Sequence, residues 1–321
     1  MPADIQIQAR SGLAPAQATA VLDLVRRTAT ADGVSPLSEH ARLHLRYGGD
    51  PQARDLLLFR DGQLAGYAHL DAPDAESGSS GEMTIDPGFR RQGLGLALAR
   101  ALIDEVGERG LRLWAHGDLP AADRLAAKAG FERTRTLFQL RRPLTGEIGE
   151  PRVAEGVVIR TFQVGQDEDA WVALNHKAFA SHPEQGAWTR ADLDVREHEP
   201  WFDPAGFFLA DRDGRLAGFH WTKIHAAGDG DAAAPGGADP EPGVRAPIGE
   251  VYVVGVDPDE QGTGLGRALT LIGLRYLRDR GLPAVMLYVD GDNAPAIRLY
   301  ESLGFTRWHT DVMFTREPPA E

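Results

Sequence analysis

Residues Glu260 to Leu269 read EQGTGLGRAL, and the chain carries a close echo of them, FRRQGLGLAL, at Phe89 to Leu98. Each stretch is a glycine-rich turn followed by apolar residues at helical spacing. Glycine lets backbone amides approach an anion closely, and the N-terminus of a helix adds partial positive charge. Both stretches therefore predict either a pyrophosphate site or a tight strand-to-helix turn without a ligand.

The pattern of these turns differs from the two common nucleotide motifs. After Gly264 and Gly266 the third glycine of a dinucleotide-binding turn is missing, and no Gly-Lys-Ser/Thr of a P-loop follows. What both copies share is Gln/Arg-x-x-Gly-x-Gly, with Gln261 in one and Arg90 in the other. The turns are therefore compatible with an anion site, but they match neither of the two common classes of nucleotide-binding motif.

The echo extends well beyond the turns. Three pairs recur in the same order: RDGQLAGY (Arg60–Tyr67) with RDGRLAGF (Arg212–Phe219), IDPGFRRQGLGLAL (from Ile85) with VDPDEQGTGLGRAL (from Val256), and DRLAAKAGF (Asp123–Phe131) with IRLYESLGF (Ile297–Phe305). Their offsets are 152, 171 and 174 residues. A tandem repeat of two homologous domains follows from this order.

Loops and the domain boundary come from the same comparison. The jump in offset places an insertion in the Gly-, Ala- and Pro-rich stretch Ala226–Pro247, which predicts a mobile loop with a shorter counterpart at Asp71–Gly81. Arg141–Gly156 has the composition of a linker. We therefore predict domains at residues 1–150 and 151–321, divided near Pro151.

Hydrophobic periodicity predicts the same α/β order in each half. Opening strands IQIQAR and VVIRTF precede helical stretches at Pro15–Thr28 and Asp167–Ala180. Asp-Gly pairs at 61–62 and 213–214 predict hairpins. In the second half a strand at Glu250–Val256 leads into the turn, and its helix is followed by a strand at residues 284–290 and a helix at 293–303. Each half is therefore expected to be a mixed central sheet flanked by helices.

Composition limits the function classes. The 321 residues have a formal net charge of −13, which disfavours non-specific nucleic-acid binding. No apolar run is long enough to span a membrane, and the first residues lack the pattern of a secretory signal. The absence of cysteine excludes disulfides, thiolate metal sites and a cysteine nucleophile. We expect a cytoplasmic monomer without nucleic-acid or membrane partners.

Taken together, the glycine turn and the helix near the end of each half resemble motifs of the GCN5-related N-acetyltransferases. VYVVGVDPDEQGTGLGRAL (251–269) resembles their acetyl-CoA pyrophosphate loop, and DNAPAIRLYESLGF (292–305) resembles the helix that closes their site. The resemblance covers both halves and implies acetyl transfer from acetyl-CoA to an amine. In that family a β-bulge splays the strand before the turn, and Gly255 is the residue expected at the bulge.

The resemblance also implies a set of acetyl-CoA contacts in each half. In the second half they are Val254, Gly255, Val256, Gln261, Gly262, Thr263, Gly264, Leu265, Gly266, Arg267, Asn293, Ala294, Pro295, Ala296, Ile297 and Arg298. In the first half they are Met83, Thr84, Ile85, Arg91, Gln92, Gly93, Leu94, Gly95 and Leu96.

A closer resemblance is carried by SHPEQGAW (181–188), FHWTKIH (219–225) and GEVYVVGVDP (249–258), which are similar to stretches of the mycothiol synthases. That family acetylates the cysteinyl amine of a cysteinyl glucosaminyl-inositol. The implied substrate contacts are Glu39, Glu184, Lys223, Glu250 and Tyr288. For Glu39 the alternative is a solvated helix face. No metal is expected, and the i, i+4 pair His40 and His44 is interpreted as an ordinary helix face.

Two residues of the second half match the family's catalytic positions. Glu250 is the candidate base for the attacking amine, and Tyr300 is the candidate acid for the departing thiolate. Their alternatives are a solvated strand-end carboxylate and ordinary aromatic packing. The first half departs from this pattern, since Ala126 stands opposite Tyr300 and Leu119 opposite Asn293. Glu82 lies three residues from Ser79, the position opposite Glu250.

The first half is therefore expected to bind acetyl-CoA without turnover, or to be a structural lobe with an empty turn. For the whole chain two alternatives stay open. The acceptor is another amine (an aminoglycoside, a polyamine or a protein N-terminus), or the protein is a non-catalytic acyl-CoA sensor.

Overall fold

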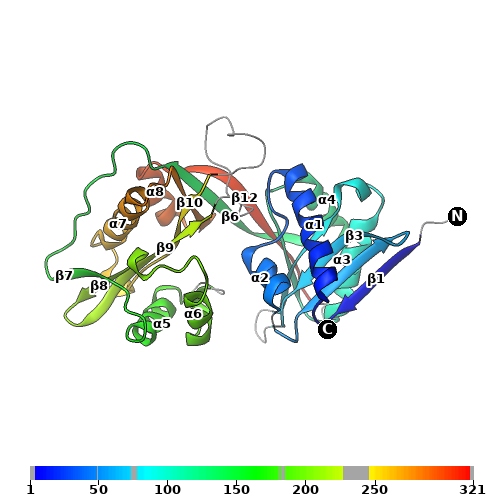
Figure 1. Ribbon diagram of the computed structural model, residues 1–321, viewed down its shortest axis with the longest axis horizontal. Coiled ribbons are helices and arrows are strands. Elements are labelled where there is room, and N and C mark those ends of the chain that lie inside the picture. The colour runs from blue at the N-terminus through cyan, green and yellow to red at the C-terminus, as the bar shows by residue number, and fades with distance from the viewer. Residues whose placement is uncertain are drawn as a thin grey trace. The chain divides into compact units, whose positions relative to one another are not determined.

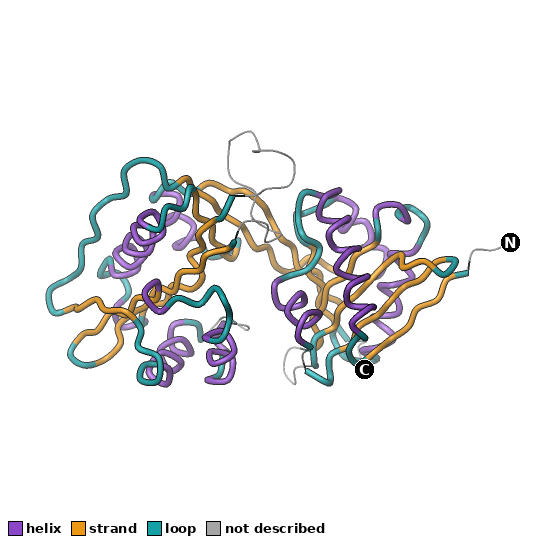
Figure 2. Tube along the Cα trace, in the orientation of Figure 1, coloured by secondary structure: helices purple, strands orange, loops and turns teal. Residues whose placement is uncertain are grey.

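The computed structural model describes residues 4–48, 50–73, 78–180, 182, 185–226 and 246–318, with the backbone alone at Glu39 and Tyr47. The chain forms two compact units. Unit 1 is residues 1–138, 290–292 and 309–321, and unit 2 is residues 139–289 and 293–308. In each unit helices flank the strands of a sheet (Figure 2). Compactness divides the chain after Phe138, whereas the sequence repeats place a boundary near Pro151.

Unit 1 is built on a mixed sheet in the order β1-β2-β3-β4-β5-β12-β6. Its strands are β1 (Ile5–Arg10), β2 (Arg54–Arg60), β3 (Gln63–Leu70), β4 (Ser79–Ile85), β5 (Leu111–Ala115) and parts of β6 (Glu132–Pro143) and β12 (Thr306–Arg316). β1 to β4 are antiparallel neighbours, whereas β4 and β5 run parallel. The parallel pair is where a crossover helix, α3, joins the two strands.

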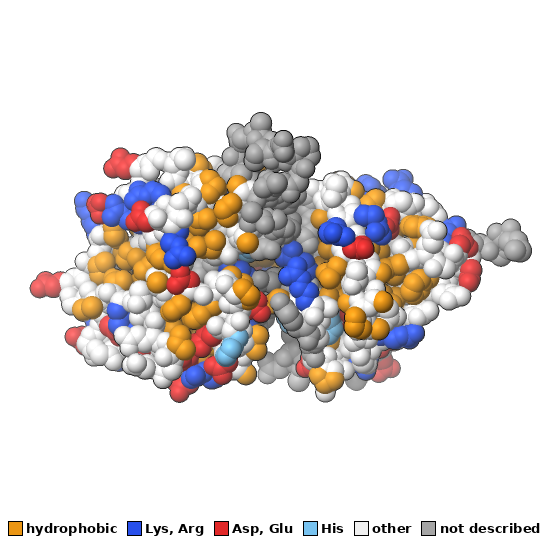
Figure 3. Space-filling view, viewed as in Figure 1, with side chains coloured by type: hydrophobic (Ala, Val, Ile, Leu, Met, Phe, Trp, Pro, Cys, Tyr) orange, Lys and Arg blue, Asp and Glu red, His pale blue; other side chains and the backbone are white. Residues whose placement is uncertain are grey.

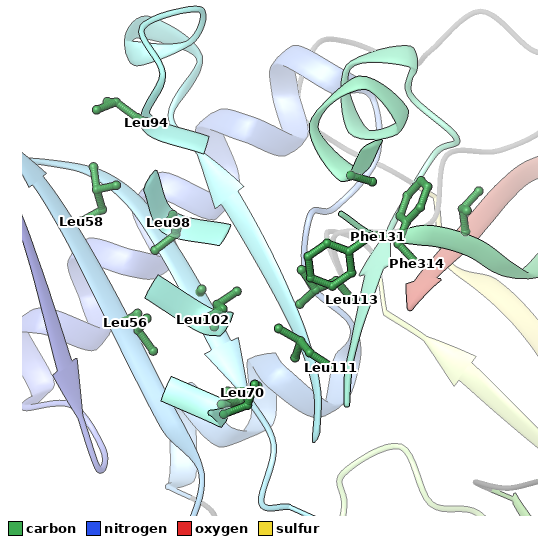
Figure 4. Close-up of a cluster of buried hydrophobic side chains, with 14 of the residues drawn as sticks. Leu56, Leu58, Leu70, Leu94, Leu98, Leu102, Leu111, Leu113, Phe131 and Phe314 are labelled. Carbon is green, nitrogen blue, oxygen red and sulfur yellow. The ribbon is translucent and has the colours of Figure 1, made fainter. Parts of the chain in front are cut away.

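Helices cover both faces of this sheet (Figure 1). They are α1 (Pro15–Asp32), α2 (Glu39–Tyr47), α3 (Leu94–Val106) and α4 (Pro120–Ala129). On one face Leu98 and Leu102 of α3 pack with Leu56 and Leu58 of β2, as Figure 4 shows. On the other face α1 and α2 form a second apolar cluster over Tyr67.

Unit 2 repeats this plan in the order β12-β6-β11-β10-β9-β8-β7. Its strands are β7 (Val157–Thr161), β8 (Phe207–Arg212), β9 (Arg215–His225), β10 (Ile248–Val256) and β11 (Ala284–Asp290), with parts of β6 and β12. The single parallel pair among these described strand pairs is β10 with β11. Its helices are α5 (Glu168–Ala178), α6 (Arg190–Glu197), α7 (Leu265–Asp279) and α8 (Ala294–Ser302).

Two features of unit 2 follow the sequence closely. The Asp-Gly turns have positive φ at both residues, 52° and 77° at Asp213 and Gly214 and likewise 47° and 78° in unit 1, as a tight hairpin requires. The helix after the glycine turn, α7, is buried along one face, as its apolar spacing predicts. Ile272 and Tyr276 are half-buried, while Leu271, Leu274 and Leu277 complete the buried face.

The first three residues of the predicted linker Arg141–Gly156 belong to a strand. β6 extends to Pro143, and Arg141 is buried, with its guanidinium 4.7 Å from the ring centroid of Trp308. Leu144 is also buried, and its backbone N–H donates to the carbonyl of Pro283. Composition alone misleads here, because arginine and proline are compatible with a strand whose partners come from a distant part of the chain. The predicted loop Ala226–Pro247 lies almost wholly outside the described residues.

Acidic and basic side chains are mixed on the face of the molecule that is drawn in Figure 3. Within the described residues no helix is both long and apolar enough to cross a bilayer.

A close approach of α7 to β9 gives the first prediction. A Cβ on Gly273 would overlap Cε1 and Nδ1 of His220, whose imidazole donates to the carbonyl of Leu269 at 2.8 Å. Burial lowers the pKa of His220 to about 4, so the ring is neutral. Gly273→Ala is expected to destabilise the protein by about 1–3 kcal/mol in urea unfolding. Gly149→Ala, with nothing near its added Cβ, is the control. Equal stability of both variants would contradict this packing.

Candidate active site

The site forms where two parallel strands part. β10 and β11 pair at Gly249 with Val285 and at Glu250 with Met286, and no later pair follows in the described strands. On its other edge β10 stays paired with β9 as far as Val256, with a register shift between Val251 and Val253. Tyr252 is therefore the extra residue of a β-bulge, and the edge of β10 that faces β11 is released beyond Glu250.

The prediction that Gly255 is the bulge residue is wrong. Gly255 lies in regular register opposite Phe219. A Cβ on Gly255 would lie 2.5 Å from Cε1 of the Phe219 ring, so the glycine makes room for that aromatic side chain. The bulge falls at Tyr252 instead, next to Glu250.

The glycine turn after β10 has the geometry of an anion cradle. A short 3₁₀ turn at Pro258–Glu260 leads to Gly262 and Gly264, whose φ values are 80° and 84°. No other atom lies within 4 Å of a Cβ built on either glycine. α7 then begins at Leu265, and the first amides of a helix have no carbonyl partner within it. The residues present thus fit a pyrophosphate group at the helix N-terminus.

Glu250 is buried and hydrogen-bonded to a histidine. Its side chain is buried, and Nε2–H of His225 donates to its Oε2 at 2.6 Å. Across the strands Glu250 pairs with Lys223, which is also buried. The Lys223 ammonium lies 4.2 Å from the ring centroid of Trp201 and 5.0 Å from that of Tyr252. Glu250 is therefore a fixed, partnered carboxylate rather than a solvated strand end.

His225 was not among the residues predicted from the sequence. The signal for it was present in WTKIH, since alternate residues of a strand share a face and Lys223 and His225 are two apart. What only the fold shows is that this face lies beside Glu250, which is 25 positions later in the chain.

Tyr300 lies on α8 and packs edge-on against Phe305, with 5.7 Å between ring centroids. Burial raises the pKa of Tyr300 to about 12, so the phenol is protonated at neutral pH. Among the described residues its hydroxyl has no hydrogen-bond partner, and it shares no hydrogen bond with Glu250. A protonated phenol with a free hydroxyl is suited to meet a ligand atom.

Five further predicted residues, four in the second half and one in the first, have other surroundings or fall outside what the structure describes. Asn293 is the N-cap of α8 and accepts from the amide of Ala296 at 3.1 Å, and Arg267 of α7 donates to Ser302 of the same helix at 2.7 Å. Tyr288 is 38% exposed, and its hydroxyl accepts from Gln139 at 2.7 Å. Glu184 lies outside the described residues. Glu39 begins α2, without a described side chain.

Unit 1 contains a cavity of about 540 Å³ at its own glycine turn. The predicted residues that line it are Met83, Thr84, Ile85, Arg91, Gly93, Gly95 and Leu96, whereas Leu94 is buried in the core. Arg91 has a φ of 62°, the left-handed conformation that Gly262 adopts in the second copy. Such a conformation is unfavourable for a residue with a Cβ, and backbone strain of this kind is often found at functional turns.

The chemistry of this first cavity differs from that of unit 2. Ala126 lines it where the repeat has Tyr300, and no tyrosine is among its lining residues. His116 lines it as well, with Nε2 3.5 Å from Glu82 and Nδ1 3.3 Å from Asp311. These two carboxylates raise the pKa of His116 despite its burial. Glu82 is thus part of an ion-pair cluster with His116 and Asp311, and it also accepts a hydrogen bond from the backbone N–H of Ser38 at 2.7 Å.

Comparisons with known proteins agree with this geometry. The model of the acetyltransferase (GNAT) family matches residues 20–131 and 171–305, one region in each half. A mycothiol acetyltransferase of Thermobispora bispora is 58% identical over 94% of this chain and 97% of its own length. One of Acidothermus cellulolyticus is 56% identical over 98% and 96%.

Solved structures give the same fold over nearly the whole chain. A GCN5-related N-acetyltransferase from Sphaerobacter thermophilus aligns with a TM-score of 0.70 and 25% identity, covering 98% of this chain and 97% of that one. A tandem GNAT protein of the clavulanic acid biosynthesis pathway aligns with a TM-score of 0.72 and 20% identity, covering 99% and 100%. The tandem arrangement predicted from the repeats is confirmed.

Proposed function

The chain belongs to the acetyltransferase (GNAT) family, and we propose that it acetylates the cysteinyl amine of desacetylmycothiol, a cysteine joined to glucosaminyl-inositol, to give mycothiol and CoA. It is an N-acetyltransferase, and members of the family use acetyl-CoA as the acetyl donor. The acceptor is supported by the end-to-end similarity to relatives named mycothiol acetyltransferase. The chemistry is supported by the buried, histidine-paired Glu250 at the point where β10 and β11 part.

Glu250 acts as the base in this proposal. An α-amine titrates at about 7.7–8.0, so much of the acceptor is protonated at neutral pH and must lose a proton before it attacks. Glu250 takes that proton, directly or through one water, while His225 holds the carboxylate in place by the hydrogen bond at 2.6 Å. The amine then forms its bond to the acetyl carbon.

Tyr300 acts as the acid. When the bond between the carbonyl carbon and sulfur breaks, the sulfur leaves as a thiolate that needs a proton. The Tyr300 hydroxyl, protonated at neutral pH, supplies that proton and regains one from solvent. The cradle at Gly262–Gly266 would hold the pyrophosphate of acetyl-CoA, which supplies the acetyl group.

The expectations of a monomer without nucleic-acid or membrane partners stay predictions from composition. The substrate contacts of Glu39, Glu184, Lys223 and Tyr288 stay predictions from the resemblance to the mycothiol synthases.

An acceptor panel tests the proposed substrate. With acetyl-CoA as donor, kcat/KM for desacetylmycothiol is expected to exceed that for an aminoglycoside, a polyamine or an N-terminal peptide by about tenfold or more. Release of CoA is the measurement. Equal rates on simple amines would leave an N-acetyltransferase with a different acceptor. No turnover of any amine would favour the non-catalytic sensor.

Substitutions at the two catalytic positions test their roles. Glu250→Gln and Tyr300→Phe are each expected to lower kcat by about 100-fold or more, because each removes a proton-transfer group. Tyr276→Phe is the matched control, since its phenol on α7 hydrogen-bonds Asp203 and has no part in the mechanism. Wild-type kcat in both site variants, with binding of acetyl-CoA intact, would show that base and acid lie elsewhere.

For unit 1 we propose binding of acetyl-CoA without turnover. Its cavity is lined by four of the six predicted turn residues, Arg91, Gly93, Gly95 and Leu96, and the left-handed Arg91 places a cation at the turn. It offers no counterpart of Tyr300. An empty structural lobe is the alternative.

The number of CoA molecules per chain tests this proposal. Calorimetry of the ligand-free enzyme is expected to show two CoA molecules bound per chain. Gly93→Val and Gly264→Val are each expected to bind only one, because valine strains these left-handed turn positions. Only Gly264→Val should lose activity. Gly281→Val is the matched control, since Gly281 has a φ of 81° but lies beyond the opposite end of α7. A single CoA in the wild type would mean that the first turn is vestigial.

A further inference from the structure

Unit 1 contains a cluster of histidine and aspartate side chains that the acetyl-transfer chemistry does not use. His40 and His44 lie on α2, Asp55 on β2 and His69 on β3, and Asp71 directly follows β3. None of the five lines the cavity at the glycine turn. Two sets of three among them place one ligand atom each within 4.8 Å of one another.

In one set, His40, His69 and Asp71, the ligand atoms converge. Nε2 of His40 and Nε2 of His69 each lie 3.1 Å from the same atom, Oδ1 of Asp71. Ligand atoms of a tetrahedral zinc ion, about 2.0–2.2 Å from the metal, lie about 3.3–3.5 Å apart. Two of the three separations are therefore already close to those of a metal site. The third, between the two imidazoles, is within 4.8 Å.

The second set acts as support for the first. Nδ1 of His69 lies 3.3 Å from Oδ1 of Asp55, whose side chain is fully buried. Asp55 also accepts from the Tyr67 hydroxyl at 2.6 Å and lies 3.3 Å from Nε2 of His44. Its oxygens are thus occupied by three protein partners. When Asp55 accepts the Nδ1 proton of His69, the lone pair of His69 is on Nε2, the nitrogen that faces Asp71.

This is the carboxylate–histidine–metal arrangement in which a buried carboxylate fixes the tautomer and orientation of a ligating imidazole. Two imidazoles and one carboxylate are nitrogen and oxygen donors that zinc accepts. The His40 side chain is 73% exposed, so an ion at this position is reachable from solvent and can complete its coordination with water.

We propose that His40, His69 and Asp71 form a site for a zinc ion that ties the first turn of α2 to the end of β3. Asp55 is a positioning residue in this site and not a ligand. The sequence led to the opposite expectation because it shows only the i, i+4 pair His40 and His44. The structure instead separates that pair, placing His44 on the buried side of the network and His40 on the open side.

Zinc titration of the full chain tests the site. The protein is expressed without a histidine tag, stripped with a chelator and titrated with Zn²⁺ by calorimetry, and its thermal unfolding is followed with and without the ion. We expect about one tight Zn²⁺ per chain and a rise in Tm on binding. Replacement of Zn²⁺ by Co²⁺ is expected to give the intense visible absorption of a tetrahedral ion.

The variants separate this site from chance binding at other histidines. His40→Ala and Asp71→Asn are expected to weaken Zn²⁺ binding by at least about tenfold and to abolish the rise in Tm. His40 is exposed, so its loss leaves the fold intact. The matched control is His198→Ala, an exposed histidine of unit 2, which should bind Zn²⁺ as the wild type does.

The proposal is overturned if the wild type binds no Zn²⁺ at micromolar concentrations, which would leave these residues as a hydrogen-bond network alone. It is also overturned if His40→Ala and Asp71→Asn bind Zn²⁺ as tightly as the wild type.

Discussion

The active site depends on the point at which β10 loses β11 as a partner. A bulge at Tyr252 adds one residue to β10 relative to β9, so the pairing with β9 continues while the pairing with β11 stops at Glu250. A parallel pair that parts in this way leaves backbone groups unpaired at the centre of a sheet. The same divergence places Glu250 at the apex, and α7 follows with its N-terminus beyond the end of the strand.

The two copies of the repeat show how much of this arrangement is needed for binding and how much for chemistry. In unit 1, β4 and β5 pair over four positions, Ser79 to Glu82, and the pairing of β3 with β4 has no register shift from Gly66 to Leu70. The glycine turn and a cavity remain. The phenol is replaced by Ala126, and Glu82 is engaged by His116 and the amide of Ser38. Unit 1 therefore keeps the glycine turn and its cavity but lacks the proton-transfer groups proposed for unit 2.

The two compact units and the two repeats do not coincide. β6 and β12 each give residues to both units, so that Asp311, from the end of the second repeat, reaches His116 and the amide of Gly117 within unit 1. A sequence repeat reports the ancestry of a segment, whereas a compact unit reports which strands are hydrogen-bonded together. The last strand of a repeat is free to add to a neighbouring sheet, because the pattern of one strand does not specify its partner.

The sequence by itself determined the tandem fold, the hairpins at Asp61-Gly62 and Asp213-Gly214, the cradle, and Glu250 and Tyr300 as the residues to examine. The tandem fold rests on repeated motifs in the same order, the hairpins and the cradle rest on turn residues and helical periodicity, and Glu250 and Tyr300 rest on the resemblance to the GNAT family. Only the tertiary structure decided that the bulge is at Tyr252 and not Gly255, that His225 supports Glu250, and that His69 and Asp71 meet His40. Those facts depend on strand register and on helices packed across a sheet. Residues 25 or more positions apart meet there through pairings that no short stretch of sequence encodes.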